Sequence, residues 1–367
     1  MTRNGFAGIV LCALLLGGLG GALALGGGTT TIASGPTVLV RVEGPASTIF
    51  QGALTLTGTV AVTADNSGTV YALPASTPLA ALELASAQGG FDLQVTDQFV
   101  FFDLFVDSVG GIGPAGFSGW VYRVDAVLPY YGAGFGWQSL GPALQDGDEI
   151  LWYWGMGEPP LRLAPPTLAR TDVPFNLLVE TTAADYFHVP GDPWPSVTWV
   201  PLDGATVHLG GSTADSDASG QATFLVPAPG TYDAFAESSG YARSAHMAVT
   251  VALSVELRVN PQTIQRNSAG RWVSVWIETP TGFDPTRLDR GNLLLGGVTV
   301  AELSYQFGHV RNPPLADPDG DGLPEILVKF DRAPLAGLAD GTYRLVLTGT
   351  YDGTLEVYGE SQPVSVR

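Results

Sequence analysis

Turn-forming residues recur at short intervals along this chain and separate runs in which apolar and polar residues alternate. The run from Val38 to Glu43 is one example, and the turn pairs Asp203-Gly204 and Pro229-Gly230 each precede another. Alternation with a period of two is typical of strands with one buried face. Glycine and proline number 48 and 27 among 367 residues and are scattered rather than concentrated. The sequence therefore predicts a mostly β fold of many short strands.

One segment departs from this pattern and has the signature of a helix. Thr77 is a suitable N-cap, Pro78 suits the first helical position, and the Gly89-Gly90 pair ends the segment. We expect a helix over 77–87 that follows a strand over 52–64. The predicted fold class is mostly β: a small α+β domain with one helix, followed by two Ig-like β-sandwiches.

Proline pairs and composition divide the chain. The pairs Pro159-Pro160 and Pro165-Pro166 indicate a stiff boundary, and a Gly/Thr/Ser-rich stretch lies near the N-terminus. We expect a signal peptide over 1–24, a linker over 25–35, a first domain over 36–156, and two β-sandwiches over 161–251 and 252–367. In the last domain strands are expected over 255–259, 272–278, 326–330, 342–348 and 354–358.

The first residues resemble an export signal. Arg3 supplies a positive charge, an apolar run follows from Phe6 to Leu25, and Ala22-Leu23-Ala24 fits a cleavage site. The alternative is an uncleaved anchor, because the run approaches the roughly 20 residues that a spanning helix needs. We expect a secreted or cell-surface protein without membrane insertion after signal cleavage.

The charge balance restricts the partners. Lysine and arginine number 16 against 35 aspartates and glutamates, so the net charge is −19. Such a surface repels phosphate and favours divalent cations, and nucleic acid is therefore not an expected partner.

Residues for catalysis are sparse. The only cysteine is Cys12, inside the predicted signal, so a cleaved chain has no disulfide, thiol nucleophile or thiolate metal site. The four histidines are scattered, and Ser118 is followed two positions later by Trp120 where a nucleophile elbow requires glycine. We predict that the protein is not an enzyme.

The segment from Asp317 to Glu325 carries the strongest metal-binding pattern. Carboxylates alternate along it, and Gly322 at the sixth position permits the sharp turn that would direct oxygen ligands inward. We predict a structural Ca²⁺ site, and the alternative is a plain acidic turn. The expected ligands are Asp317, Asp319, Asp321, the carbonyl of Leu323, and Glu325.

Aromatic residues concentrate between 130 and 137, where they alternate with glycine. Flat aromatic faces on a flexible loop suit sugars, planar cofactors or apolar patches of a partner. Burial of the rings against their own domain is an equal alternative. The candidate ligand-binding residues are Tyr130, Tyr131, Phe135 and Trp137.

Three segments of the first domain together resemble a known family. The predicted helix, the segment from Ser118 to Asp125 (SGWVYRVD) and the segment from Leu144 to Tyr153 (LQDGDEILWY) are similar to the C-terminal domain of transcobalamin and intrinsic factor. Asp125 stands where that family usually has asparagine. The resemblance implies cobalamin as a cofactor, but transcobalamins bind it between this domain and a helical barrel, and this sequence contains no such barrel.

The other two domains resemble accessory modules. The segments 203–207, 217–222 and 228–232 are similar to carboxypeptidase-regulatory and bacterial Ig-like sandwiches. The segments 259–264 and 270–278 resemble a sandwich module of exported microbial proteins, and the acidic segment resembles the calcium loops of thrombospondin type-3 repeats. The first of these resemblances implies a stalk module without chemistry of its own, and the resemblance of the last domain indicates little about a ligand.

Together these features predict a non-catalytic exported protein for binding or display, in which the first domain presents a surface for a ligand or partner. The expected partner is an extracellular protein, a glycan or a small molecule. The alternatives are a substrate-binding accessory subunit of an extracellular enzyme assembly and a corrinoid-binding surface protein.

Overall fold

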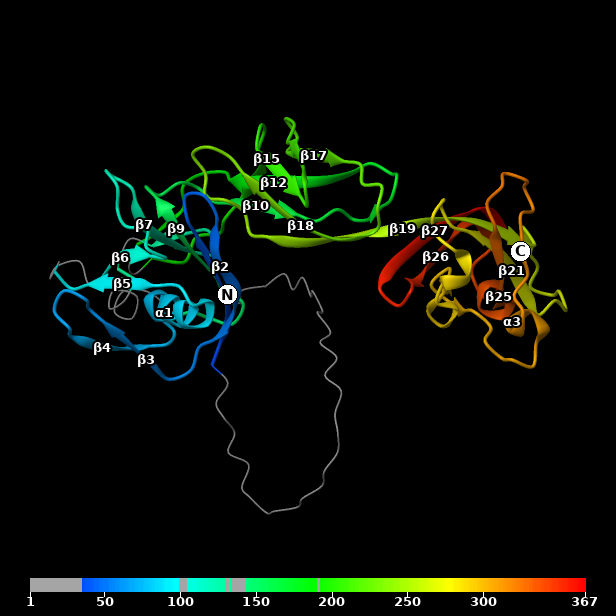
Figure 1. Cartoon of the computed structure of the whole chain (residues 1–367), viewed down its shortest axis with the longest axis horizontal. Helices are drawn as coiled ribbons and strands as arrows, with labels where there is room; N and C mark the ends of the chain where they lie inside the picture. The colour runs from blue at the N-terminus through cyan, green and yellow to red at the C-terminus, as the bar shows by residue number, and fades with distance from the viewer. Residues whose placement is uncertain (1–34, 99–103, 130–131, 134–142, 190–191) are drawn as a thin grey trace, which may run out of the picture. The chain divides into compact units, whose positions relative to one another are not determined.

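The computed structural model describes residues 35–98, 104–129, 132–133, 143–189 and 192–367 (Figure 1). Strands make up most of its elements, and the predicted mostly β fold class is confirmed. Buried apolar side chains form three main clusters, largely within residues 38–152, 161–251 and 253–366. Within the described residues, no helix is both long enough and apolar enough to cross a bilayer.

The first cluster belongs to a four-stranded sheet, two hairpins and one helix. The sheet order is β2-β1-β9-β7, with β1 and β9 parallel, and the hairpins are β3-β4 and β5-β6. The elements are β1 Thr37–Glu43, β2 Thr48–Thr55, β3 Thr59–Thr63, β4 Val70–Pro74, α1 Pro78–Gly89, β5 Leu93–Thr96, β6 Phe105–Val109, β7 Gly119–Val124, β8 Leu128–Pro129 and β9 Glu149–Gly155.

Local chemistry explains where helix α1 begins and ends. The Thr77 side chain accepts a hydrogen bond from the backbone of Ala80, and Pro78 occupies the first turn. Gly90 ends the helix at a φ of 68°, and its N–H donates to the Ser86 carbonyl. The predicted helix is confirmed and extends two residues further. The single strand expected over 52–64 is wrong, because the chain turns at Gly58 (φ 67°) between β2 and β3.

The second cluster lies between two sheets. One sheet has the order β10-β12-β14, with β17 also paired to β12, and the other contains β16-β15-β18-β19. The strands are β10 Leu161–Ala164, β11 Ala169–Arg170, β12 Phe175–Thr182, β13 Phe187–His188, β14 Trp199–Pro201, β15 Thr206–Leu209, β16 Ser212–Asp215, β17 Gln221–Phe224, β18 Gly230–Glu237 and β19 Met247–Asn260.

The third cluster is covered by strands that include the second half of β19. The pairing order is β24-β25-β21-β19-β27-β26-β22-β23, and β20 also pairs with β27. The elements are β20 Thr263–Ile264, β21 Trp272–Glu278, η1 Pro285–Arg287, η2 Arg290–Asn292, β22 Leu294–Leu295, β23 Thr299–Val300, α3 Gly308–Arg311, β24 Leu315–Ala316, β25 Glu325–Asp331, α4 Arg332–Ala336, β26 Gly341–Tyr351 and β27 Leu355–Val366.

Strand β19 is shared between the second and third clusters (Figure 1). Its first residues pair with β18 through Val251, and from Leu253 onward it pairs with β27 and β21. The domain boundary predicted between residues 251 and 252 therefore falls inside a continuous strand, with no linker at that point.

Candidate functional site

The end of β9 and the segment after β18 meet in a small apolar contact. Leu151, Tyr153 and Ala242 are buried together, and Val121 packs against them. The backbone joins the same segments, because the N–H of Ala242 donates to the Pro159 carbonyl and its carbonyl accepts from Leu161. These contacts fix residues 238–243 beside the first domain.

A chain of charged side chains runs alongside this contact. Arg243 donates to Glu43 at 3.2 Å and to Glu237 at 3.2 Å. Arg41 contacts the other oxygen of Glu43 at 3.3 Å and also donates to the Arg243 carbonyl. The side chains of Arg41 and Glu43 are only 4% and 3% exposed, so each charge is compensated within the protein.

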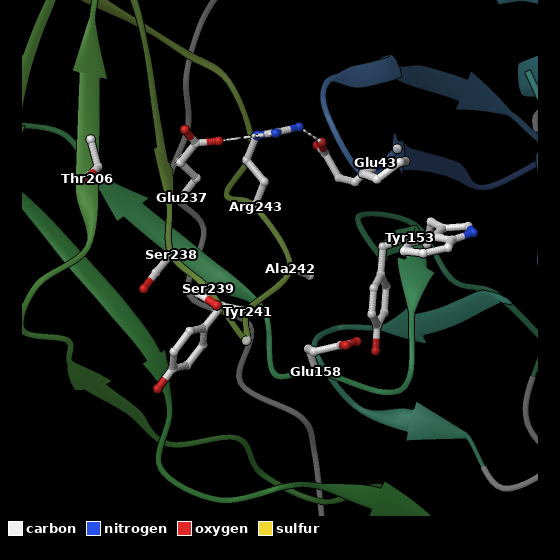
Figure 2. A pocket seen from close by; sticks show the side chains of 14 residues that line it. Glu43, Tyr153, Glu158, Thr206, Glu237, Ser238, Ser239, Tyr241, Ala242 and Arg243 are labelled. Atoms are coloured by element: carbon white, nitrogen blue, oxygen red, sulfur yellow. Dashed lines mark hydrogen bonds and ion pairs between the residues drawn. The ribbon is translucent and has the colours of Figure 1, made fainter. Parts of the chain in front are cut away.

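A pocket of about 420 Å³ opens beside these charges. In Figure 2 the Arg243 guanidinium lies between Glu237 and Glu43, with Tyr153 and Glu158 on one side and Tyr241 on the other. The residues that line it are Glu43, Gly44, Pro45, Tyr153, Trp154, Glu158, Thr206, Glu237, Ser238, Ser239, Gly240, Tyr241, Ala242 and Arg243.

Hydrogen bonds decide which polar groups in the pocket are free. One oxygen of Glu158 accepts from the backbone of Met156 and Gly157. Among the described residues, no side-chain hydrogen bond is made by the hydroxyls of Ser238, Ser239 or Tyr241. These hydroxyls can donate to and accept from a ligand.

Burial and hydrogen bonding act in opposite directions on the ionisable groups of the pocket. Burial raises the pKa of the Tyr153 phenol, although the charge of Arg123 opposes it, so this group stays a neutral donor. Burial acts to raise the pKa of Glu237, but hydrogen bonds from Arg243 and His208 outweigh it, and the pKa lies below its ordinary value. Glu237 is therefore an ionised acceptor at neutral pH.

The aromatic candidates are not part of this description, because Tyr130, Tyr131, Phe135 and Trp137 lie outside the described residues. Their role as ligand-binding residues stays a prediction.

Residues 238–243 were not singled out by sequence reasoning. Their only local signal is the Ser238-Ser239-Gly240 turn after a strand.

The acidic segment joins β24 to β25. Gly320 and Gly322 have φ values of 82° and 96°, which the expected sharp turn requires. Asp317 accepts from the backbone of Gly320 at 2.7 Å and of Gly322 at 3.0 Å, and these bonds hold its pKa below the ordinary value despite some burial. Asp317 therefore shapes the turn.

The remaining acids of this segment lie near side chains of strands β21 and β19. Asp319 and Asp321 lie beside Glu278 of β21, a residue that the sequence did not single out. Arg258 of β19 donates to Asp319 and, at 3.1 Å, to Glu325. Leu323 donates its N–H to Asp321.

No protein-family model and no curated protein sequence matches this chain. Among solved structures, it is similar to a β-glycosidase from Bacteroides vulgatus at 12% identity and a TM-score of 0.17, over 57% of this chain and 25% of that one. It is also similar to domains 4 and 5 of the S-layer protein SbsC at 12% identity and a TM-score of 0.19, over 56% of this chain and 98% of that one.

A third similar structure is the SGBP-B protein of a Bacteroides ovatus mixed-linkage glucan utilization locus in complex with a heptasaccharide. The identity is 14% and the TM-score 0.17, over 68% of this chain and 61% of that one. The chain thus spans a quarter of the glycosidase and less than two thirds of the glucan-locus protein. Scores this low assign no function, and the transcobalamin resemblance stays a prediction.

Proposed function

We propose that this protein is a non-catalytic, exported binding protein whose pocket between β9 and the segment 238–243 takes a short neutral oligosaccharide. The observation that carries the proposal is the composition of this pocket, in which free hydroxyls, carboxylates and one guanidinium lie next to aromatic side chains. Its volume of about 420 Å³ is within the range of small-ligand sites.

The chemistry of the lining favours a ligand rich in hydroxyl groups. Sugar hydroxyls can accept from Arg243 and donate to Glu158, whose second oxygen has no hydrogen bond among the described residues. The rings of Trp154 and Tyr241 are half-buried at the pocket and offer apolar faces to the C–H groups of a sugar.

The charge of the lining favours a neutral ligand. The lining contains three carboxylates, those of Glu43, Glu158 and Glu237, and one guanidinium, and the chain carries a net charge of −19. An anionic saccharide would meet repulsion both near the pocket and at long range.

The same geometry favours binding over hydrolysis. Glycoside hydrolysis generally needs two carboxyl groups that flank the scissile bond, one of which carries a proton. Here Glu43 and Glu237 are both ion-paired to Arg243, and the lining contains neither histidine nor cysteine.

The proposal of export rests on the signal-like residues 1–24, and the two β-sandwiches would act as a stalk at the cell surface or on a secreted protein.

The test is calorimetric titration of the purified protein with maltotriose, cellotriose, xylotriose and triacetylchitotriose. Trigalacturonic acid is the anionic control, and cyanocobalamin tests the transcobalamin resemblance. We expect binding of at least one neutral trisaccharide and none of trigalacturonic acid. Tyr241→Ala and Glu158→Gln should each weaken binding at least tenfold, about 1.4 kcal/mol. Tyr305→Ala, at an exposed site in another domain, should have no effect.

Three results would contradict the proposal. They are no binding of any neutral trisaccharide, binding of cyanocobalamin alone, and saccharide binding that both pocket variants leave unchanged. In the last case, loss of binding on replacing Tyr130, Tyr131, Phe135 and Trp137 with alanine would move the site to the aromatic segment.

A further inference from the structure

Four glutamates stand in one row across four neighbouring strands. Glu256 of β19 is directly opposite Glu360 of β27 on one side and Glu278 of β21 on the other. Glu278 is in turn directly opposite Glu325 of β25. Residues that are directly opposite share a face of the sheet, and like charges there destabilise it. This row therefore concentrates negative charge that the fold itself must compensate.

Glu278 has no internal compensation. It is 7% exposed, and within the described part of the chain no hydrogen-bond donor or cationic group contacts its carboxylate. Burial, followed by the charges of Asp321, Glu256, Asp319 and Glu325, raises its pKa to about 7. A carboxylate that is nine-tenths buried without a partner is costly, and such groups normally coordinate a cation or pair with one.

Glu325 is in a similar position on the neighbouring strand. It is 3% exposed, and only one of its oxygens meets Arg258, whereas Oε2 is buried without any hydrogen-bond partner in the described residues. Arg258 also contacts Asp319, so one guanidinium serves two acids. Its single positive charge leaves Glu278 and Asp321 uncompensated.

The acidic segment supplies the oxygens that face Glu278. One carboxylate oxygen from each of Glu278, Asp319 and Asp321 lies within 4.8 Å of the other two. Two oxygens bound to the same Ca²⁺ at about 2.3–2.6 Å can be up to about 5 Å apart, so this spacing suits a shared ion. The cluster contains no nitrogen or sulfur ligand, which favours a hard cation over zinc.

We infer that Glu278, Asp319 and Asp321 bind a Ca²⁺ ion that fastens the loop 317–324 to strand β21. The orphaned oxygen of Glu325 adds negative charge from the neighbouring strand. We assign Asp317 to shaping the loop rather than to coordination, because each of its oxygens already accepts a backbone N–H group of the loop. Ca²⁺ suits this site better than Mg²⁺, because an irregular loop and a strand do not impose the near-ideal octahedral geometry that Mg²⁺ requires. The site is independent of the saccharide pocket.

The test uses the purified full protein, stripped with EGTA and then titrated with CaCl₂ or with MgCl₂. We expect saturable Ca²⁺ binding by calorimetry and a Tm that rises by several degrees with Ca²⁺ in excess, with a smaller effect of Mg²⁺. Glu278→Gln should weaken Ca²⁺ binding at least tenfold and yet raise the Tm in EGTA, because it removes an uncompensated buried charge. A purely structural glutamate would instead lower the Tm in EGTA when replaced.

Asp321→Asn should also weaken Ca²⁺ binding, and Glu356→Gln, at an exposed position of β27 outside the row, is the matched control. Identical melting curves in Ca²⁺ and EGTA would overturn the inference. Ca²⁺ binding that survives Glu278→Gln but is lost in Asp317→Asn would also overturn it, since the ion would then be held by the loop alone.

Discussion

The guanidinium of Arg243 lies 3.2 Å from the carboxylate of Glu43, although 200 residues separate them in the chain. Both side chains are buried or nearly so, at 10% and 3% exposure. This pair, with Arg41, joins β1 to the segment after β18, and Glu43 and Arg243 both line the pocket.

We predict that Arg243→Met lowers the free energy of unfolding by about 3 kcal/mol, the low end for breaking a buried ion pair, because Arg41 still contacts Glu43. The double variant Glu43→Gln/Arg243→Met should recover most of this loss, because the buried carboxylate is gone, Arg41 keeps its ion pair with Glu149, and Glu237 is partly exposed to solvent. Urea denaturation of the wild type and the two variants measures both effects. A double variant no more stable than the single one would show that packing, not charge, determines the loss.

The acid limit of stability in the first domain should depend on Asp97. This carboxylate accepts hydrogen bonds from Ser67, Tyr71 and Asn66, and the bond from Ser67, followed by that from Tyr71, holds its pKa below the ordinary value. A lowered folded-state pKa contributes stability above the unfolded value of about 3.9, and this stability is lost as the pH falls through the folded value.

Asp97→Asn should therefore lower the Tm at pH 6 and flatten its fall below about pH 4. Asp92→Asn is the control, since the side chain of Asp92 is exposed and makes no hydrogen bond in the described residues. Thermal melts from pH 6 to pH 2.5 give the comparison. Parallel curves for wild type and Asp97→Asn would contradict the assignment.

The two tryptophans at the end of β9 should differ in their contribution to stability. Trp152 is 2% exposed and stacks on Tyr122 at a ring-centroid distance of 5.1 Å, whereas Trp154 is half-buried. We expect Trp152→Ala to cost about 3–5 kcal/mol. Trp154→Ala should cost about 1–2 kcal/mol and also weaken saccharide binding. Equal losses in chemical denaturation would argue against this division.

In the absence of Ca²⁺, the positive charge of Arg258 should compensate part of the negative charge of Asp319 and Glu325. Arg258→Gln leaves Asp319 and Glu325 without their cation, so the Tm in EGTA should fall. Saturating Ca²⁺ should restore most of the loss, and the Tm difference between Ca²⁺ and EGTA should exceed that of the wild type. A difference that stays equal or shrinks, measured by differential scanning calorimetry, would show that Arg258 and the ion do not share these acids.

Elements set by local chemistry were predictable from the sequence. The strand expected over 272–278 coincides with β21, and the capping signals of Thr77 and Gly90 placed helix α1 within two residues. In contrast, β26 and β27 are longer than expected, because their pairing with each other continues past the residues whose alternation is clear.

The sites depended on information that no local pattern contains. The sequence drew attention to Asp319 and Asp321, but Glu278 lies about 40 residues earlier and meets them only through the register of β21 against β25. Likewise, nothing near Glu43 or Arg243 indicates that they meet. The register between strands and the contacts between domains depend on long-range packing. This register and these contacts determine which charged side chains lie next to each other.

The alternation of buried and exposed residues along strand β19 is continuous across the two apolar clusters that it joins. From Val249 to Val259 every odd-numbered residue is buried, first in the second apolar cluster and then in the third. The same face of the strand therefore contributes to both cores. Inserting one residue near Ala252 would invert the facing of the residues that follow relative to those that precede. Either the third cluster would have to accept Glu256 and Arg258 in place of valine and leucine, or the second cluster would have to accept Thr250 in place of valine. Inserting two residues would leave the same residues facing both cores. The number of residues at the junction of the two sandwiches is therefore constrained, unlike the length of a linker between independent modules.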